Sequence, residues 1–249
     1  MTPQLSLGAD GVATITLRRP QHLNRLHRED LHALLAHFAA LAADPAPRAL
    51  VITGQGRAFC AGFHLGELDG ADDPRLFETM VDALEALPLP TIARLNGSVY
   101  GGATDLALAC DFRIGVTGME LRMPAARLGL HYYPNGLRRY VSRLGVAAAK
   151  RLFLLAEAVP AEGLLALGYL DALVAPEALD AEVARHAAAL AANAPLAVRG
   201  MKRSLDEIAR GAFDLDAMRA REAACAASAD LREGVAAFAE RRAPRFHGR

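Results

Sequence analysis

Two glycine-containing segments of the sequence have the residue types and spacing to stabilise an oxygen anion. In residues 50–68 an apolar run leads through glycines to Phe63, and in residues 95–111 a helical pattern begins at Gly102. The start of a helix presents backbone N–H groups without partners and the positive end of the helix dipole. If the N–H groups of Phe63 and Gly102 meet at one carbonyl oxygen, they can stabilise an enolate or a tetrahedral anion.

Glycines at these positions have two other interpretations. They can simply form the tight turns that join strands to helices in α/β proteins. They can also bind a dinucleotide, because Gly54 and Gly56 follow a strand-like run, but Phe59 occupies the place of the third small residue in that fingerprint. The pattern therefore argues against nicotinamide binding and leaves the turn and oxyanion interpretations open.

The segments that must position these loops alternate between strand and helix patterns. Residues 4–18 predict a β-hairpin around Asp10-Gly11, and apolar residues at helical spacing extend from about residue 28 to Pro45. Buried strands are predicted at 49–53, 91–95 and 111–116, with helices between them near 75–86 and 102–109. This order predicts an α/β fold with crossover connections.

The second half of the chain has a different composition. Beyond about residue 145 the strand signals fade, and the sequence is rich in alanine, the strongest helix former. Helices are expected at 146–157, 161–167, 178–192, 196–209 and 214–227. We place a boundary at Pro195, so that residues 1–194 form an α/β core and residues 195–249 a helical region that packs against it.

The charge balance excludes some classes of partner. The chain has 249 residues, with 28 lysines and arginines against 28 aspartates and glutamates. Because a polyanion requires a basic field, we expect neither nucleic acid nor an anionic membrane surface as the main partner. We also expect no secretory signal and no membrane span. The cysteines (Cys60, Cys110 and Cys225) lack metal-type spacing, which favours reduced thiols in the cytoplasm.

The histidines give no metal-binding pattern either. His22, His27, His32 and His37 are scattered over one helical region without convergent partners in the sequence. His32 and His37 are five residues apart, whereas a helical metal pair is four apart. We therefore predict no metal site.

Several segments, in their order along the chain, resemble the crotonase (enoyl-CoA hydratase/isomerase) superfamily. AFCAGFHL and NGSVYGGATDLALACD are similar to its two oxyanion segments, and LRMPAARLGL is similar to its second active-site loop. The segments RRPQHLNRLHREDLHALL and REGVAAFAERRAPRF resemble its first helix region and its C-terminal signature. The resemblance implies a spiral of ββα units with a C-terminal α-helical trimerisation region, assembled as a homotrimer or a dimer of trimers.

The resemblance also implies roles for individual residues. Members of this superfamily bind a CoA thioester and polarise its carbonyl with two backbone N–H groups, which correspond to those of Phe63 and Gly102 here. Asp105 matches the first of two catalytic glutamates, although it could instead complement the dipole of its helix. Ala125 matches the second glutamate and cannot transfer a proton, so ordinary hydration by two carboxylates is not expected.

Contacts with CoA and with the acyl group follow from the same resemblance. The implied CoA contacts are Asn24, Arg25, Leu26, Ala61, Phe238 and Arg241, the last two often reaching a neighbouring subunit. Coenzyme A would be the carrier part of the substrate, with no separate cofactor. Tyr132 matches an active-site tyrosine of methylmalonyl-CoA decarboxylase-type members, whereas packing is the alternative role for Tyr132 and its neighbour Tyr133. His64 and His131 adjoin the same presumed pocket, and a structural role is the alternative for each.

Together these observations predict a cytoplasmic enzyme that acts on an acyl-CoA thioester by an isomerase- or lyase-type reaction. An isomerase needs one base to move a proton, and Asp105 has the right chemistry. Two alternatives stay open. A malonyl-type CoA decarboxylase would need only the oxyanion donors and one proton donor, because the departing CO₂ leaves an enolate. A non-catalytic member would bind acyl-CoA without turnover.

Overall fold

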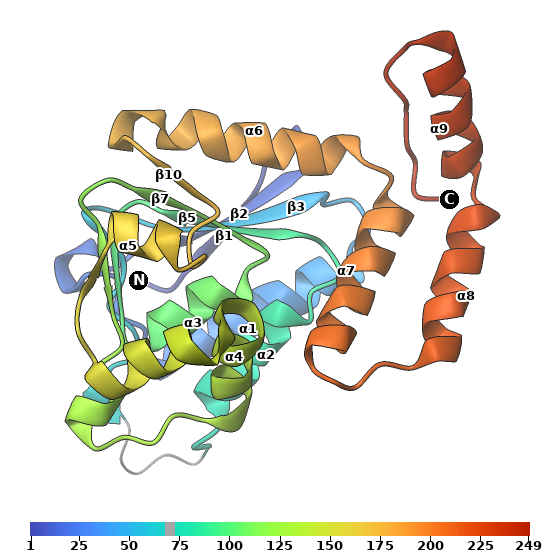
Figure 1. The fold of residues 1–249 in the computed structure, drawn as a ribbon. Coiled ribbons are helices and arrows are strands. Elements are labelled where there is room, and N and C mark those ends of the chain that lie inside the picture. Colours follow the sequence, from blue (N-terminus) through green and yellow to red (C-terminus); the bar gives the residue numbers. More distant parts are fainter. Residues whose placement is uncertain (68–72) are drawn as a thin grey trace.

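The computed structural model describes residues 1–67 and 73–249, and its centre is a six-stranded sheet (Figure 1). The strand order is β1-β2-β3-β5-β7-β10, and every neighbouring pair except β1 and β2 is parallel. The strands are β1 (Gln4–Leu7), β2 (Val12–Leu17), β3 (Ala49–Gly54), β5 (Thr91–Leu95), β7 (Phe112–Val116) and β10 (Ala172–Val174). The predicted hairpin is confirmed, with Leu7 opposite Ala13 and Gly11 at a φ of 79° in the turn.

A second, smaller sheet turns the chain into a spiral. Its order is β4-β6-β8-β9, formed by β4 (Ala58–Cys60), β6 (Ser98–Tyr100), β8 (Glu120–Arg122) and β9 (Val159–Pro160). Strands β3, β5 and β7 of the large sheet are followed by β4, β6 and β8 and then by the helices α2 (Leu76–Glu85), α3 (Gly102–Ala109) and α4 (Pro134–Lys150). This repeat confirms the predicted spiral of ββα units. The short strands were not predicted, because three residues carry too little periodicity.

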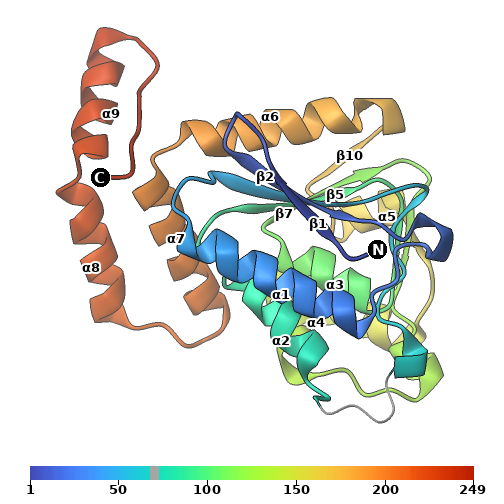
Figure 2. The ribbon, with the colours of Figure 1, turned by 180° about the vertical axis from the view of Figure 1, so that it is seen from behind.

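Helices cover both faces of the large sheet. One face carries α6 (Leu179–Ala192), and the other carries α1 (Arg28–Ala43) with α2 and α3 (Figure 2). The core between α1 and the sheet is apolar, since Leu31, Leu34 and Phe38 are buried together with Ile15 and Ile52. Parallel strands covered on both faces need such continuous apolar runs.

Two expectations for the middle of the chain were wrong. Strand pairing continues past residue 145, because β10 joins the sheet beside β7 after the short helix α5 (Ala161–Ala166). Helix α4 begins at Pro134, well before the helix expected at 146–157, and is interrupted at Gly145, where φ is 80°. A π-helical turn, Arg151–Leu155, follows it.

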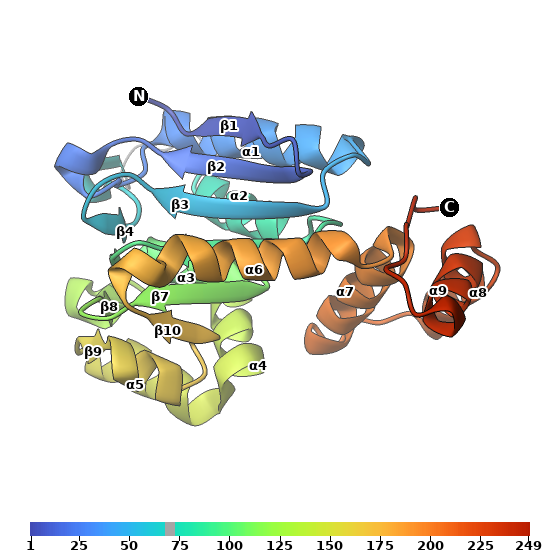
Figure 3. The same cartoon turned by 90° about the horizontal axis from the view of Figure 1, so that it is seen from above.

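The region after residue 194 is helical and extends away from the sheets (Figure 3). It consists of α7 (Pro195–Ala209), α8 (Leu215–Ala226) and α9 (Ala229–Glu240). Lys202 of α7 pairs with Asp111 of the core at 2.5 Å. Large apolar side chains on these helices are exposed, Phe238 by 88%. In the part of the chain that the structure describes, no helix combines the length and apolar character that crossing a membrane requires.

Candidate functional site

The two glycine-containing loops meet at one cavity of about 310 Å³. Phe63 and Gly102 both line it, as do Phe77 of α2 and Ala125. The adjacent tyrosines Tyr132 and Tyr133, which precede α4, complete one wall. A mostly apolar cavity with a few polar groups is the usual form of a small-molecule site.

Gly62 allows the two loops to come this close. Its φ is 85°, and a Cβ atom there would lie 2.7 Å from the Tyr100 carbonyl oxygen and 2.9 Å from the Gly102 nitrogen. Because of both features, a residue with a side chain could occupy this position only if the backbone shifted. A Cβ atom on Gly102 would lie 2.6 Å from the Phe77 ring, so a side chain there would displace that ring.

The hydrogen bonds around Phe63 and Gly102 leave both backbone N–H groups unpaired within the described residues. Leu26 N–H donates to the Gly62 carbonyl, and the Leu26 carbonyl accepts from His64 N–H, both at 2.8 Å. This parallel bridge therefore uses the residues on either side of Phe63 and makes no bond to the Phe63 N–H. Gly102 is the first residue of α3, where an N–H group has no partner within the helix. Among the residues that the structure describes, neither N–H group has an acceptor.

Asp105 lies behind the cavity wall. Its side chain on α3 is fully buried and is not among the groups that line the cavity. Its Oδ2 atom accepts a hydrogen bond from Arg139 Nη1 at 2.7 Å and another from the Tyr133 hydroxyl, while Oδ1 has no partner within the described chain. Burial raises the pKa of the Asp105 carboxyl, against the opposing charge of Arg139.

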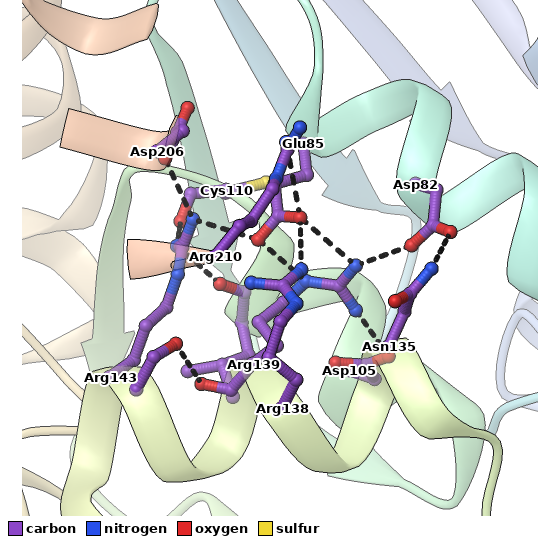
Figure 4. Close-up of polar contacts among 12 residues, drawn as sticks. Asp82, Glu85, Asp105, Cys110, Asn135, Arg138, Arg139, Arg143, Asp206 and Arg210 are labelled. Carbon is purple, nitrogen blue, oxygen red and sulfur yellow. Dashed lines mark hydrogen bonds and ion pairs between the residues drawn. The ribbon is translucent and has the colours of Figure 1, made fainter. Parts of the chain in front are cut away.

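Arg139 holds Asp105 within a buried ionic network (Figure 4). The guanidinium is fully buried and also pairs with Asp82 at 2.8 Å and with Glu85 at 3.0 Å, both on α2. Although burial opposes it, the charges of Arg139 and Arg138 lower the pKa of the Glu85 carboxyl to about 2. The network therefore ties α2, α3 and α4 together, and Asp105 is in addition hydrogen-bonded to Tyr133, a residue that lines the cavity.

Tyr133 connects Asp105 to the cavity, a role that the sequence did not reveal. Its ring lines the cavity, while its hydroxyl donates to Asp105. The Tyr132 ring stacks on it with centroids 4.3 Å apart, and the Tyr132 hydroxyl lies 3.4 Å from the Tyr133 hydroxyl. Gly136 makes room for this pair, since a Cβ atom there would lie 2.4 Å from the Tyr132 ring. Burial raises the pKa of both phenols well above the usual range, so both are neutral near pH 7.

A carboxylate that the resemblance did not indicate, that of Glu78 on α2, lies at the cavity. Ala125 lines the cavity and brings no ionisable group to it, but Glu78 of α2 lines the same cavity. The amphipathic pattern of residues 75–86 predicted this helix without indicating which polar residue faces the site. His131 also lines the cavity, and its Nδ1 atom lies 2.8 Å from the Tyr132 carbonyl oxygen. His64 is not among the lining residues.

The residues expected to contact CoA differ in their burial and in whether they line the cavity. Ala61 lines the cavity. Asn24 is buried, and its amide donates to the carbonyls of Gln55 at 2.8 Å and Ala58 at 2.9 Å, which ties it to the loop before β4 and to the first residue of that strand. Arg25 is partly exposed, whereas Leu26 is buried and pairs with Phe63.

Phe238 and Arg241 belong to the end of α9, and neither lines the cavity of its own chain. Both are exposed, so they are accessible to another molecule.

The fold is a spiral of ββα units, and its cavity is lined by two residues, Phe63 and Gly102, whose backbone N–H groups have no acceptor in the described chain. Comparison with known proteins identifies the class: the family model Enoyl-CoA hydratase/isomerase matches residues 8–249. The chain belongs to this family.

Individual relatives resemble the chain over most of its length. Crotonyl-CoA hydratase of Syntrophomonas wolfei is 30% identical, with 94% of each chain covered. The 1,2-epoxyphenylacetyl-CoA isomerase of Escherichia coli is 32% identical, with 96% of each chain covered. The crystal structure of an enoyl-CoA hydratase from Bacillus anthracis superposes with a TM-score of 0.92 at 28% identity, covering 100% of both chains. These matches confirm the crotonase fold.

Proposed function

We propose that this protein binds an acyl-CoA thioester and stabilises its enolate through the N–H groups of Phe63 and Gly102. The observation that carries the proposal is the close approach of the two loops at Gly62, with both N–H groups lacking acceptors in the described chain. Two backbone donors aimed at one oxygen would stabilise the charge that develops when a proton or CO₂ leaves the α-carbon. The names of the relatives, which refer to CoA esters, support this class of substrate.

The reaction that we propose is an isomerisation in which Tyr133 carries the proton. The Tyr133 oxygen takes a proton from the α-carbon while its own hydroxyl proton passes to Asp105 Oδ2. The electrons of the broken C–H bond move to the thioester oxygen as an enolate. The reverse transfer then returns a proton to a different carbon, which shifts the double bond. The hydrogen bond from Tyr133 to Asp105 supports this route, and the raised pKa of Asp105 makes it a stronger base.

Hydration by two opposed carboxylates is the less favoured reaction. It requires a second acid or base at the Ala125 position, where the side chain is a methyl group. Glu78 is the group that could activate water instead, and a Glu78→Gln variant tests this. If that variant abolishes hydration of a 2-enoyl-CoA, the isomerase proposal is wrong or incomplete.

Decarboxylation of a malonyl-type CoA ester is the second candidate, and the stacked phenols favour it. Loss of CO₂ leaves the enolate directly, so the site needs only a proton donor. Tyr132 and Tyr133 are neutral phenols on the cavity wall. In this reaction Tyr132→Phe would reduce turnover at least as strongly as Tyr133→Phe.

The deciding experiment is incubation with 3-enoyl-, 2-enoyl- and malonyl-type CoA esters in D₂O, followed by chromatographic separation of the positional isomers and mass analysis of the products. Isomerisation predicts a shifted double bond and deuterium in the product, both lost in Tyr133→Phe. Tyr100→Phe is the matched control, because Tyr100 lines the same cavity but its hydroxyl donates to Glu120 at 3.1 Å and not to Asp105. Binding of CoA esters without turnover of any ester would favour the non-catalytic alternative.

We also propose that the protein assembles in the cytoplasm as a homotrimer or a dimer of trimers through its C-terminal helices. Met201, Leu205 and Ile208 support this, because they are exposed along one face of α7, as is Phe238 on α9, and contiguous exposed apolar surface marks interaction sites. Arg241, which follows α9, and Phe238 would then contact CoA held by a neighbouring subunit. Sedimentation of the wild type as a monomer at micromolar concentration would contradict the assembly.

A further inference from the structure

Three side chains with metal-binding chemistry come together outside the cavity. His27, His64 and Glu67 each offer a ligand atom, and these atoms lie within 4.8 Å of one another. All three side chains are partly exposed, so an ion can reach them from solvent. The expectation that His27 has no convergent partner was wrong, because its partners lie 37 and 40 residues further along the chain.

The backbone places the two histidines side by side. His27 directly follows Leu26 and His64 directly follows Phe63, and Leu26 and Phe63 form a parallel β-bridge. The two imidazole rings lie with centroids 4.8 Å apart and an interplanar angle of 59°. Their positions therefore depend on the same bridge that shapes the first oxyanion loop.

Glu67 completes the set from the short 3₁₀ turn Leu65–Glu67. Its Oε2 atom accepts a hydrogen bond from the Arg28 backbone N–H at 2.9 Å. This bond orients the carboxylate so that Oε1 faces His27 Nδ1. A ligand carboxylate held by a backbone donor is typical of metal sites, where the supporting hydrogen bond orients the ligand.

We propose that His27 Nδ1, one ring nitrogen of His64 and Glu67 Oε1 bind a divalent cation of the Zn²⁺ class. Two imidazole nitrogens and one carboxylate oxygen suit Zn²⁺ and its neighbours in the first transition row. Mg²⁺ and Ca²⁺ prefer oxygen ligands and many of them. Three protein ligands leave a fourth tetrahedral position for water. The inference is independent of the reaction proposed above.

The positive charge of Arg25 disfavours a bound cation, so a variant of Arg25 is expected to increase the affinity for the ion. Its Nε–H donates to His27 Nε2 at 3.3 Å, which leaves the ring proton on Nδ1. Metal binding at Nδ1 requires that proton to move to Nε2, so the Arg25 donor must turn away. Arg25→Gln removes the positive charge and supplies an amide oxygen that can accept from the protonated Nε2. We therefore expect Arg25→Gln to bind Zn²⁺ more tightly than the wild type.

The test is calorimetric titration of the full chain with Zn²⁺, after removal of any histidine tag and treatment with a chelator. We expect one equivalent to bind. Each of His27→Ala, His64→Ala and Glu67→Gln should weaken the affinity by more than about tenfold, since changes even to residues that support a metal ligand cost that much. The exposed histidines His22 and His32 provide matched controls, and their alanine variants should bind like the wild type.

Further measurements check the folding of each variant, the coordination geometry and the ion selectivity. Circular dichroism and thermal unfolding identify any variant that fails to fold, and Co²⁺ absorption reports tetrahedral coordination directly. Mg²⁺ should give no saturable heat. Absence of Zn²⁺ binding to the wild type, or equal affinity in the three ligand variants, would overturn the proposal.

Discussion

Removing the Tyr133 hydroxyl tests the proposed route for the proton with the least disturbance. Tyr133→Phe keeps the ring, which packs against Tyr132 and Phe77, and deletes the hydrogen bond to Asp105 Oδ2. Asp105 retains its pair with Arg139 at 2.7 Å, so the buried charge stays neutralised. The folded state should lose about 1.5–3 kcal/mol, the usual contribution of a hydrogen bond to a charged group.

The effect on the reaction should be larger than the effect on stability. Positioned acid–base groups contribute roughly 10²–10⁴ in rate, so kcat should fall by that factor. KM should change little, because the donors at Phe63 and Gly102 belong to the backbone. The assay is steady-state kinetics on the ester that turns over fastest, together with deuterium incorporation from D₂O and a urea unfolding curve.

A double variant decides whether Tyr133 and Asp105 act in series. If the proton passes through both, Tyr133→Phe combined with Asp105→Asn should be no slower than the slower single variant. If Tyr133→Phe retains wild-type kcat within about threefold while Asp105→Asn is inactive, Asp105 reaches the substrate by itself and the proposed route is refuted.

Three other predictions follow from the packing and the charges. Gly62→Ala should lower kcat by about 10²–10³, because its methyl group would meet the Tyr100 carbonyl and the Gly102 nitrogen; kinetics on folded protein measure this. Arg139→Leu should cost about 3–5 kcal/mol in urea unfolding, since Asp105 and Glu85 lose a buried partner. The pKa of Glu85 is lowered to about 2, so its ionised form stabilises the fold above its ordinary pKa, and this is lost as pH falls through about 2. Acid unfolding of the wild type, compared with Glu85→Gln, should show that loss only in the wild type.

The general architecture was predictable because turn residues and runs of apolar residues mark its strands and helices locally in the sequence. The hairpin at residues 4–18 and the buried strands β3, β5 and β7 follow from turn residues and apolar runs. Helices α2 and α3 lie within the expected ranges. Strand β10 was not predicted, because it has only three residues and its partner β7 lies more than fifty residues earlier in the chain.

The sequence predicted which loops and which tyrosines meet at the cavity, but it did not predict the contacts of the buried side chains. Glycines at 62 and 102 predicted loops that can present N–H groups, and at Gly62 both the positive φ and the close approach of the second loop require that residue type. By contrast, nothing in the sequence near Asp105 indicates that Arg139 and Tyr133 will reach it, since they lie 34 and 28 residues away. The roles of these side chains depend on how α3 and α4 pack.

The sequence by itself determined the α/β spiral, the family and the absence of a carboxylate at position 125, since these depend on residue type and order. Only the tertiary structure decided that Asp105 is buried behind Tyr133, that Glu78 lines the cavity and that His27, His64 and Glu67 converge. The physical reason is the same in each case. Burial, pKa and metal-binding geometry depend on distances between segments far apart in the chain, and folding alone sets those distances.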